Sequence, residues 1–361
     1  MTENEKNVLF KSFETNKINL RNRFVMAPVP TGFIKDGVPT GRNVQFYGKR
    51  AESIGLIIAG AININHPTAS NNDKIPFINS EEAIAAWKEI TDEVHAKNGK
   101  IVGQIWHSGG FRKLGQPDLS SEATTPSGLF NGEKIGEPMT KEEIKDMIST
   151  FAEAAGNVKK AGFDGVEIHG AHGSLIHDFF CDNMNKRTDE YGPSNRTLFA
   201  EEVIKACREV VGDEFPILLR ISHFKMYDLG AQLAASPQEF ESFIVPLSNA
   251  GVDIFDCSAL NFTDSAFEGV EGSLAYWTKL FTNKPTINIG NVGSQKPFLH
   301  DLPELITKIV TNQDLSDKAS SGKQTKINNI EALNRSLEND EYDLVAVGRP
   351  ILIDAEWLNK L

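Results

Sequence analysis

Eight short apolar runs, spread along the whole chain, limit the folds that this sequence can adopt. They cover residues 24–27, 56–61, 101–106, 165–168, 217–221, 252–257, 286–289 and 344–347. Most are continuous rather than alternating, which is typical of parallel strands covered on both faces. Helical patterns fill most intervals, at residues 43–53, 81–97, 141–160, 196–211, 237–249 and 274–281. This repetition predicts an α/β fold, a (β/α)₈ TIM barrel, with residues 1–361 forming a single domain. A doubly wound open sheet is the alternative.

Composition and charge exclude several classes of partner. The net charge is −12, from 49 acidic and 37 basic residues, which argues against nucleic-acid or anionic-membrane binding. No apolar run reaches the ~18 residues of a membrane helix, and the polar start MTENEKNVLF is unlike a signal peptide. The three cysteines lie far apart, which predicts neither disulfides nor a metal site. We therefore expect a cytoplasmic protein. A polar stretch at residues 314–328 is interpreted as an insertion without a catalytic role.

The stretch from residue 161 to 196 carries the strongest functional signal. The apolar run at 165–168 leads into HGAHG, which places His169 and His172 among small residues. Two imidazoles three residues apart can point into one space if the backbone turns there, and small residues let a flat ligand approach the main chain. Barrel enzymes carry their sites at the C-terminal ends of the strands. We therefore interpret the pair as part of a site rather than as core histidines.

This stretch resembles the Old Yellow Enzyme family of FMN-dependent ene-reductases. The family pattern is roughly GFDGVEIHGAHGYL followed by NxRTDEYGGSxxNR, and this chain has GFDGVEIHGAHGSL and NKRTDEYGPSNR. The resemblance extends from about residue 17 to 361. Two departures stand out: Ser174 replaces the tyrosine that donates a proton in the family, and the loop is shorter around Pro193.

The first strand ends in a segment that resembles the family's APMT or APMC motif, which lies against the flavin ring. The matching residues are Ala27, Pro28, Val29 and Pro30. In the family, the fourth position is usually Thr or Cys and donates a hydrogen bond near flavin O4 and N5. Proline has no such donor, so the flavin loses one unless Thr31 replaces it. A rigid loop without an electronic purpose is the alternative.

Three further strand ends match the family's flavin contacts. The resemblance implies that Ala61 presents its backbone to the flavin. The Gln104 amide has two donors and an acceptor, which suits the pyrimidine edge. Arg220 ends a buried strand, where a cation is costly without a negative partner, and the family places a cation near flavin N1 and O2. A structural glutamine and a structural salt bridge are the alternatives.

The loops after the seventh and eighth predicted strands contain Gly290-Asn291 and Gly348-Arg349. Glycine-containing loops at these two places form the usual phosphate site of barrel enzymes. The guanidinium of Arg349 adds charge-assisted hydrogen bonds. The segment DLVAVGR also resembles the family's DLVxxGR. We expect Asn291, Gly348 and Arg349 to hold the FMN phosphate.

Together, the resemblance implies an enzyme with non-covalent FMN that takes a hydride from NAD(P)H. The hydride would pass from flavin N5 to a small-molecule acceptor: an enone, a quinone or a nitro compound. His169 and His172 would donate hydrogen bonds to the acceptor's oxygen, while Ser174 is too short and too weak an acid to replace the tyrosine. The sequence is compatible with a homo-oligomer and predicts no metal. A flavin-binding redox sensor with little turnover is the alternative function.

Overall fold

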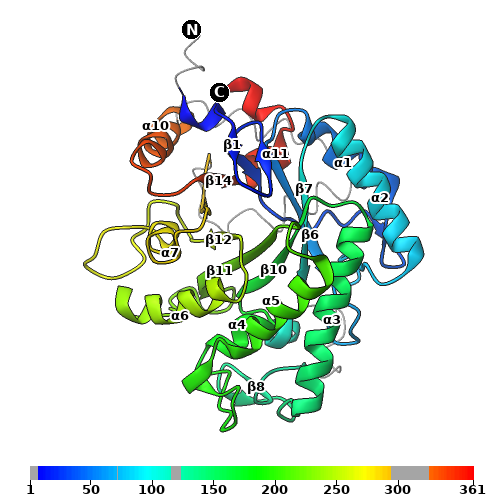
Figure 1. Ribbon diagram of the computed structural model, residues 1–361, viewed down its shortest axis with the longest axis vertical. Coiled ribbons are helices and arrows are strands. Elements are labelled where there is room, and N and C mark those ends of the chain that lie inside the picture. The colour runs from blue at the N-terminus through cyan, green and yellow to red at the C-terminus, as the bar shows by residue number, and fades with distance from the viewer. Residues whose placement is uncertain (1–6, 71, 115–122, 294–324) are drawn as a thin grey trace.

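The computed structural model describes residues 7–70, 72–114, 123–293 and 325–361. Eight parallel strands form a closed barrel, several of which are labelled in Figure 1. Their order around the barrel is β10-β11-β12-β13-β14-β3-β6-β7. Their bounds are β3 Phe24–Met26, β6 Leu56–Asn63, β7 Ile101–Trp106, β10 Gly165–His172, β11 Ile217–Lys225, β12 Ile254–Ser258, β13 Thr286–Ile289 and β14 Leu344–Val347. The barrel is closed by parallel pairing of its last strand, β14, with its first strand, β3. The predicted (β/α)₈ barrel is confirmed, and the open sheet is excluded.

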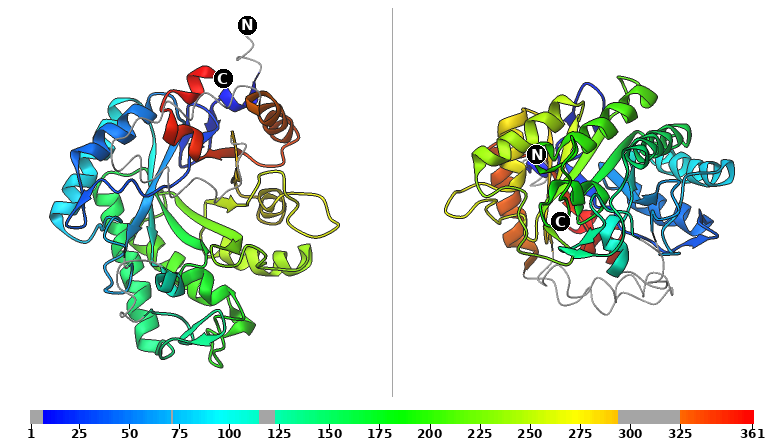
Figure 2. Two further views of the ribbon diagram at one scale, coloured as in Figure 1. Left: turned by 180° about the vertical axis from the view of Figure 1, so that it is seen from behind. Right: turned by 90° about the horizontal axis from the view of Figure 1, so that it is seen from below.

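Helices lie around the outside of the barrel (Figure 2). Their bounds are α1 Gly41–Ala51, α2 Glu81–Ala96, α3 Lys141–Lys160, α4 Leu175–Phe180, α5 Leu198–Val211, α6 Pro237–Asn249, α7 Leu274–Thr282, α10 Thr325–Glu338 and α11 Arg349–Ile353. The sequence at the start of α3 forms a capping box, in which Thr140 and Glu143 each accept a backbone hydrogen bond from the other. Of the helices that the structure describes, none is long and apolar enough to cross a membrane.

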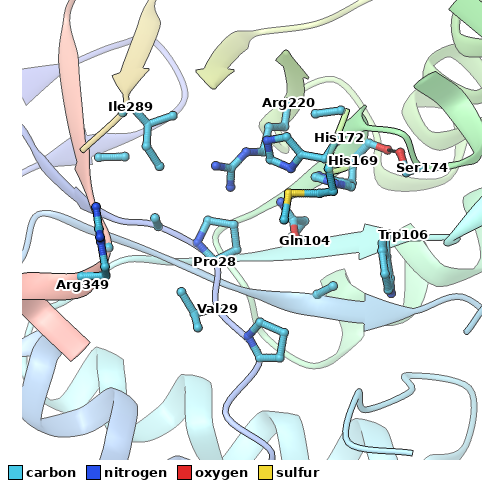
Figure 3. Close-up of a pocket in the computed structure, with 18 of the residues that line it drawn as sticks. Pro28, Val29, Gln104, Trp106, His169, His172, Ser174, Arg220, Ile289 and Arg349 are labelled. Atoms are coloured by element: carbon cyan, nitrogen blue, oxygen red, sulfur yellow. Dashed lines mark hydrogen bonds between the residues drawn. The ribbon is translucent and has the colours of Figure 1, made fainter. Parts of the chain in front are cut away.

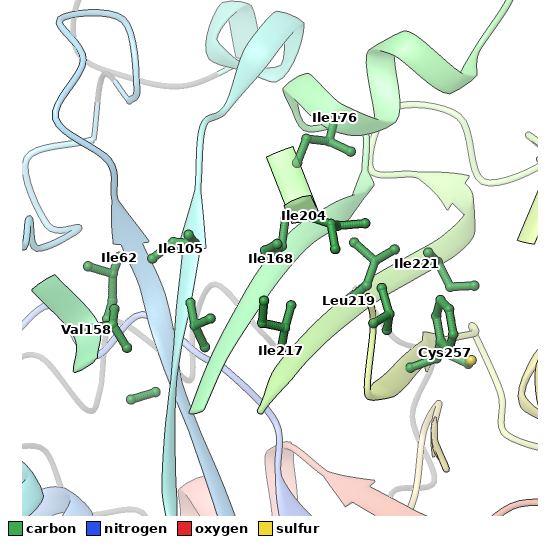
Figure 4. Packing of buried hydrophobic residues seen from close by; sticks show 14 of the residues in the cluster. Ile62, Ile105, Val158, Ile168, Ile176, Ile204, Ile217, Leu219, Ile221 and Cys257 are labelled. Carbon is green, nitrogen blue, oxygen red and sulfur yellow. The ribbon is translucent and has the colours of Figure 1, made fainter. Parts of the chain in front are cut away.

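Side chains along each strand alternate between the barrel interior and the helices. On β11, Leu218 belongs to the inner cluster, whereas Ile217, Leu219 and Ile221 belong to the outer one. Figure 4 shows part of this outer layer, between the strands and the helices α3 and α5. Burying one such side chain contributes roughly 1.5–3 kcal/mol. Because both faces are buried, the strands appear in the sequence as continuous apolar runs.

A short antiparallel hairpin, β1 (Phe13–Glu14) and β2 (Asn19–Leu20), covers the N-terminal end of the barrel. Phe13, Ile18 and Leu20 pack in one cluster with inward-facing strand residues. Lys17 Nζ lies 2.7 Å from the carboxylate of Asp253, just before β12. The hairpin therefore closes the barrel at the end opposite to the strands' C-terminal ends.

The remaining short elements lie in the connections. They are the hairpin strands β4 Ile34–Lys35, β5 Val38–Pro39, β8 Leu129–Phe130 and β9 Glu133–Lys134, and the 3₁₀ turns Val8–Phe10, Gly109–Leu114, Pro193–Asn195 and Trp357–Lys360. Residues 314–324 of the predicted insertion lie outside the described residues, and residues 325–328 belong to α10.

Several strands extend beyond the ends predicted from the sequence. β10 continues to His172 instead of ending at residue 168, and β11 continues to Lys225 instead of 221. The prediction stopped too early because most residues of these extensions are small or polar, so they do not continue an apolar run. His169 and His172 therefore lie in the last four residues of β10, at the C-terminal end of the strand.

Candidate active site

A cavity of about 260 Å³ lies at the C-terminal ends of the barrel strands (Figure 3). Its lining includes every residue that the sequence assigned to the site: Ala27, Pro28, Val29, Pro30, Ala61, Gln104, His169, His172, Ser174, Arg220, Asn291, Gly348 and Arg349. In Figure 3, Arg349 lies at one end of the cavity and Trp106 and Ser174 lie toward the other. The structure thus brings together residues from all parts of the chain.

One end of the cavity carries a cation held by a side-chain network. The Arg349 guanidinium donates a hydrogen bond to the side-chain oxygen of Asn291, and Asn291 Nδ2 donates to Asn261 Oδ1 at 3.2 Å. A Cβ at Gly290 would lie 2.6 Å from the carbonyl carbon of Asn261, so only glycine allows this close approach. A Cβ at Gly348 would meet no atom within 4 Å, which shows open space beside the arginine. A phosphate group fits this end in charge and room.

Two polar side chains face the middle of the cavity from inside the barrel. Gln104 Nε2 donates to Glu167 Oε1 at 2.7 Å, which orients the amide. Arg220 lies with its Nε 3.5 Å from Asp256 Oδ2, and its Nη2 donates to Ser258 Oγ at 3.4 Å. The salt bridge considered as the alternative is therefore present, yet Arg220 still lines the cavity and its Nε makes no hydrogen bond to a described residue. A buried cation beside an amide fits the pyrimidine edge of a flavin.

The wall formed by Pro28, Val29 and Pro30 provides no side-chain donor. Thr31, which could have replaced the missing donor, does not line the cavity. Its hydroxyl donates to Asn43 Oδ1 at 2.7 Å and accepts from the N–H of Phe33 at 3.3 Å. This wall therefore offers an apolar surface on which a flat ring can lie.

The two histidines meet because the strand is distorted between them. In a regular strand, residues three apart point to opposite faces. Here the pairing of β10 with β11 shifts register between Gly170 and His172, and His172 has φ +64°, a left-handed conformation that is uncommon for histidine. The N–H of His172 donates to Ser222 Oγ at 3.0 Å and holds this conformation. As a result the two ring centroids lie 5.2 Å apart.

Both imidazoles are held neutral. Burial, and then the positive charge of Arg220, keep the pKa of His169 and of His172 well below the ordinary histidine value. His169 Nδ1 is buried without a hydrogen-bond partner among the described residues. His172 Nε2 lies 2.9 Å from Ser258 Oγ. A neutral imidazole has one N–H donor, so the pair can donate hydrogen bonds to a ligand without adding charge.

Ser174 directly precedes α4 as its N-cap residue and is almost completely buried. Its hydroxyl donates to the carbonyl oxygen of His169 at 3.0 Å. Tyr227 does not line the cavity, so it does not replace the missing tyrosine there. Its hydroxyl donates weakly to Asp178 Oδ1 at 3.5 Å, and burial raises its pKa. Tyr276 does not line the cavity either. Within the described lining there is no tyrosine, carboxyl group or thiol to act as an acid.

The residues assigned to the site from the sequence leave out Ile75, Trp106 and Phe111, which form the apolar end of the cavity together with Met226. Trp106 packs edge-on against His169, with centroids 6.1 Å apart. Trp106 ends a predicted strand, which was a usable signal, and Met226 directly follows β11. Ile75 and Phe111 belong to the connections between barrel strands, and no local sequence pattern shows which part of a connection packs against the cavity. No group of three potential His, Cys, Asp or Glu metal ligands occurs in the part of the chain that the structure describes.

Comparisons with known proteins identify the family. Residues 8–299 match the NADH:flavin oxidoreductase / NADH oxidase family. A putative 12-oxophytodienoate reductase 13 of Oryza sativa subsp. japonica is 38% identical over 61% of this chain and 60% of its own length. Cinnamate reductase of Clostridium sporogenes is 30% identical over 98% of this chain and 52% of its own length. These matches thus span little more than half of the two relatives.

A solved structure supports the same assignment. Morphinone reductase in complex with tetrahydroNAD is 28% identical, with a TM-score of 0.70 over 95% of this chain and 87% of that one. The match with the family covers most of this chain, and the match with cinnamate reductase covers nearly all of it. The chain therefore belongs to the NADH:flavin oxidoreductase / NADH oxidase family, the FMN-binding enzyme family that includes Old Yellow Enzyme.

Proposed function

We propose that this protein is an NAD(P)H oxidoreductase that passes a hydride from flavin N5 to an electron-poor small molecule, with quinones and nitro compounds preferred over simple enones. The observation that carries the proposal is the described lining around His169 and His172: two neutral hydrogen-bond donors, and no tyrosine beside them. Bound FMN would supply the redox chemistry, and the chain supplies orientation and electrostatics.

The residues divide into three groups along the cavity. Arg349 and Asn291 hold the phosphate end, and Gln104 and Arg220 face the pyrimidine edge. The proline wall at residues 28–30 provides the surface for the ring. These roles follow from charge, hydrogen-bonding capacity and position in the cavity lining.

The acceptor would place its oxygen near the histidine pair. N–H donors there stabilise the negative charge that develops on a carbonyl, quinone or nitro oxygen during hydride transfer. An enone also needs a proton on carbon, and Ser174 donates its own hydrogen to the carbonyl of His169. Water would have to supply that proton. The names of the relatives, for cinnamate and 12-oxophytodienoate, are the reason to keep unsaturated carbonyl compounds among the acceptors.

The net charge of −12 supports a small-molecule partner rather than a nucleic acid. The three cysteines are free. This is compatible with the cytoplasmic location that the sequence predicts.

Stopped-flow spectroscopy of the purified, FMN-loaded protein tests the proposal. We expect NADH or NADPH to bleach the flavin, and a quinone or a nitroarene to restore its colour faster than cyclohexenone does. Brisk reoxidation by cyclohexenone would contradict the acceptor preference. Flavin that reacts with none of the three acceptors would favour the redox-sensor alternative.

A further inference from the structure

A layer of four polar side chains crosses the barrel interior directly beneath the cavity. Gln104, Glu167, Arg220 and Asp256 come from the neighbouring strands β7, β10, β11 and β12. Glu167 and Asp256 are fully buried, and the other two are nearly so. Only Gln104 and Arg220 also line the cavity, so the two carboxyl groups lie behind the residues that face the flavin site.

Hydrogen-bond donors are too few in this layer for two ionised carboxylates. Glu167 Oε1 accepts from Gln104 at 2.7 Å, and Asp256 Oδ2 lies 3.5 Å from Arg220 Nε. Glu167 Oε2 and both oxygens of Asp256 have no hydrogen-bond partner among the described residues. Two negative charges would face one guanidinium in a space removed from water, which is strongly unfavourable.

The pKa shifts of Glu167 and Asp256 also disfavour ionisation of both carboxyl groups. Burial, followed by the negative charge of Asp256, keeps the pKa of Glu167 well above its ordinary value. Burial also raises the pKa of Asp256, although Arg220 opposes this. The other ionisable groups nearby, His169 and His172, are neutral. Two interacting carboxyl groups of this kind titrate as a pair and hold one proton between them.

We propose that Glu167 and Asp256 are positioning residues that share a single proton, and that the one negative charge left on the pair sets how strongly Arg220 stabilises reduced FMN. The part of the proposal that concerns reduced FMN rests on the proposed function. With one proton shared, the guanidinium is balanced by one carboxylate. If both carboxyl groups were absent, the full positive charge of Arg220 would act on the negative charge that FMN gains on reduction. This would raise the flavin's midpoint potential.

Three variants separate this proposal from a merely structural role. In Glu167→Gln or in Asp256→Asn, the remaining carboxyl group should ionise against Arg220, so either change keeps the charge of the pair. Each single variant should therefore lose the infrared C=O signal of one buried carboxylic acid at neutral pH and keep a midpoint potential close to that of the unchanged protein. Asp178, a separate buried carboxyl group with a raised pKa, should keep its own signal throughout.

The double variant removes the charge. In the FMN-loaded Glu167→Gln, Asp256→Asn protein, the ratio of affinities for reduced and oxidised FMN should rise at least ~10-fold, which is about 30 mV for a two-electron couple. Asp164→Asn is the control. This change removes a carboxylate that pairs with Lys100 at the opposite end of β10. It should change neither the infrared carboxylic-acid signal nor the midpoint potential.

Two results would overturn the proposal: a single variant that keeps the full carboxylic-acid signal, or a folded double variant whose potential equals that of the unchanged protein. If the double variant does not fold, the infrared measurement on the single variants still decides whether the proton is shared. If the unchanged protein binds no FMN, the proposed function fails, whereas the infrared measurement still tests the pair.

Discussion

Ser174→Tyr tests the acceptor preference most directly. The serine side chain lines the cavity. Ser174 is the N-cap residue of α4, but its side chain makes no capping hydrogen bond, so the variant loses none. The variant does lose the 3.0 Å hydrogen bond to the carbonyl of His169. A bond of this kind contributes about 0.5–1.5 kcal/mol, which a barrel of this size can lose and still fold.

The expected gain follows from acidity and reach. A phenol has a pKa of ~10, far below that of an aliphatic hydroxyl, and its ring extends the donor further into the cavity. General acid catalysis contributes ~10²–10⁴-fold, or about 3–5 kcal/mol of barrier. Because the cavity is not shaped around a phenol, we expect a gain nearer the low end, at least ~10-fold in reoxidation by cyclohexenone.

Stopped-flow measurement of the two half-reactions gives the answer. Flavin reduction by NAD(P)H needs no such acid and should be nearly unchanged. Ser174→Phe is the matched control, because it adds the ring and loses the same hydrogen bond but has no hydroxyl. A Ser174→Tyr protein that folds, binds FMN and is reoxidised by cyclohexenone no faster than Ser174→Phe would refute the reasoning, and the ene-reductase activity should then be abandoned for this site.

Three further changes test other parts of the cavity. Arg349→Ala should weaken FMN binding by about ten- to a hundredfold, since a charge-assisted contact is worth roughly 1.5–3 kcal/mol; flavin retained through dialysis at the unchanged level would contradict this role. The charge-transfer band of bound 4-hydroxybenzaldehyde should disappear in a His169→Ala, His172→Ala double variant, and its survival at full strength would exclude the pair as the phenolate site. Pro30→Thr should raise the midpoint potential by about 10–30 mV, because one hydrogen bond to the reduced flavin contributes about 0.5–1.5 kcal/mol; an unchanged potential would mean that another group already donates there.

The strand positions and the cavity lining could be predicted because both are encoded locally. A doubly covered strand needs a continuous apolar run, and the functional residues lie within such runs or shortly after them, as Gln104 and Arg349 do. Closure of the barrel then brings these ends together without further information from the sequence.

Other features depend on contacts that no local pattern encodes. The left-handed conformation of His172 is held by Ser222, which lies 50 positions further along the chain. Glu167 and Asp256 each stand inside an apolar run, and a continuous run does not show which side chains face inward. Only the closed barrel shows that these two carboxyl groups lie close together. The apolar end of the cavity likewise depends on the path of the long connections that carry Ile75 and Phe111 back to the barrel.

The hairpin at residues 13–20 has a kinetic consequence. Because it plugs the N-terminal end of the barrel, the route to the cavity runs through the C-terminal end. Under the proposed function, the nicotinamide and the electron acceptor would share this entrance and the same cavity, so we expect that neither binds while the other remains. Double-reciprocal plots of rate at several fixed acceptor concentrations should accordingly give parallel lines, and each substrate at high concentration should inhibit by occupying the place of the other.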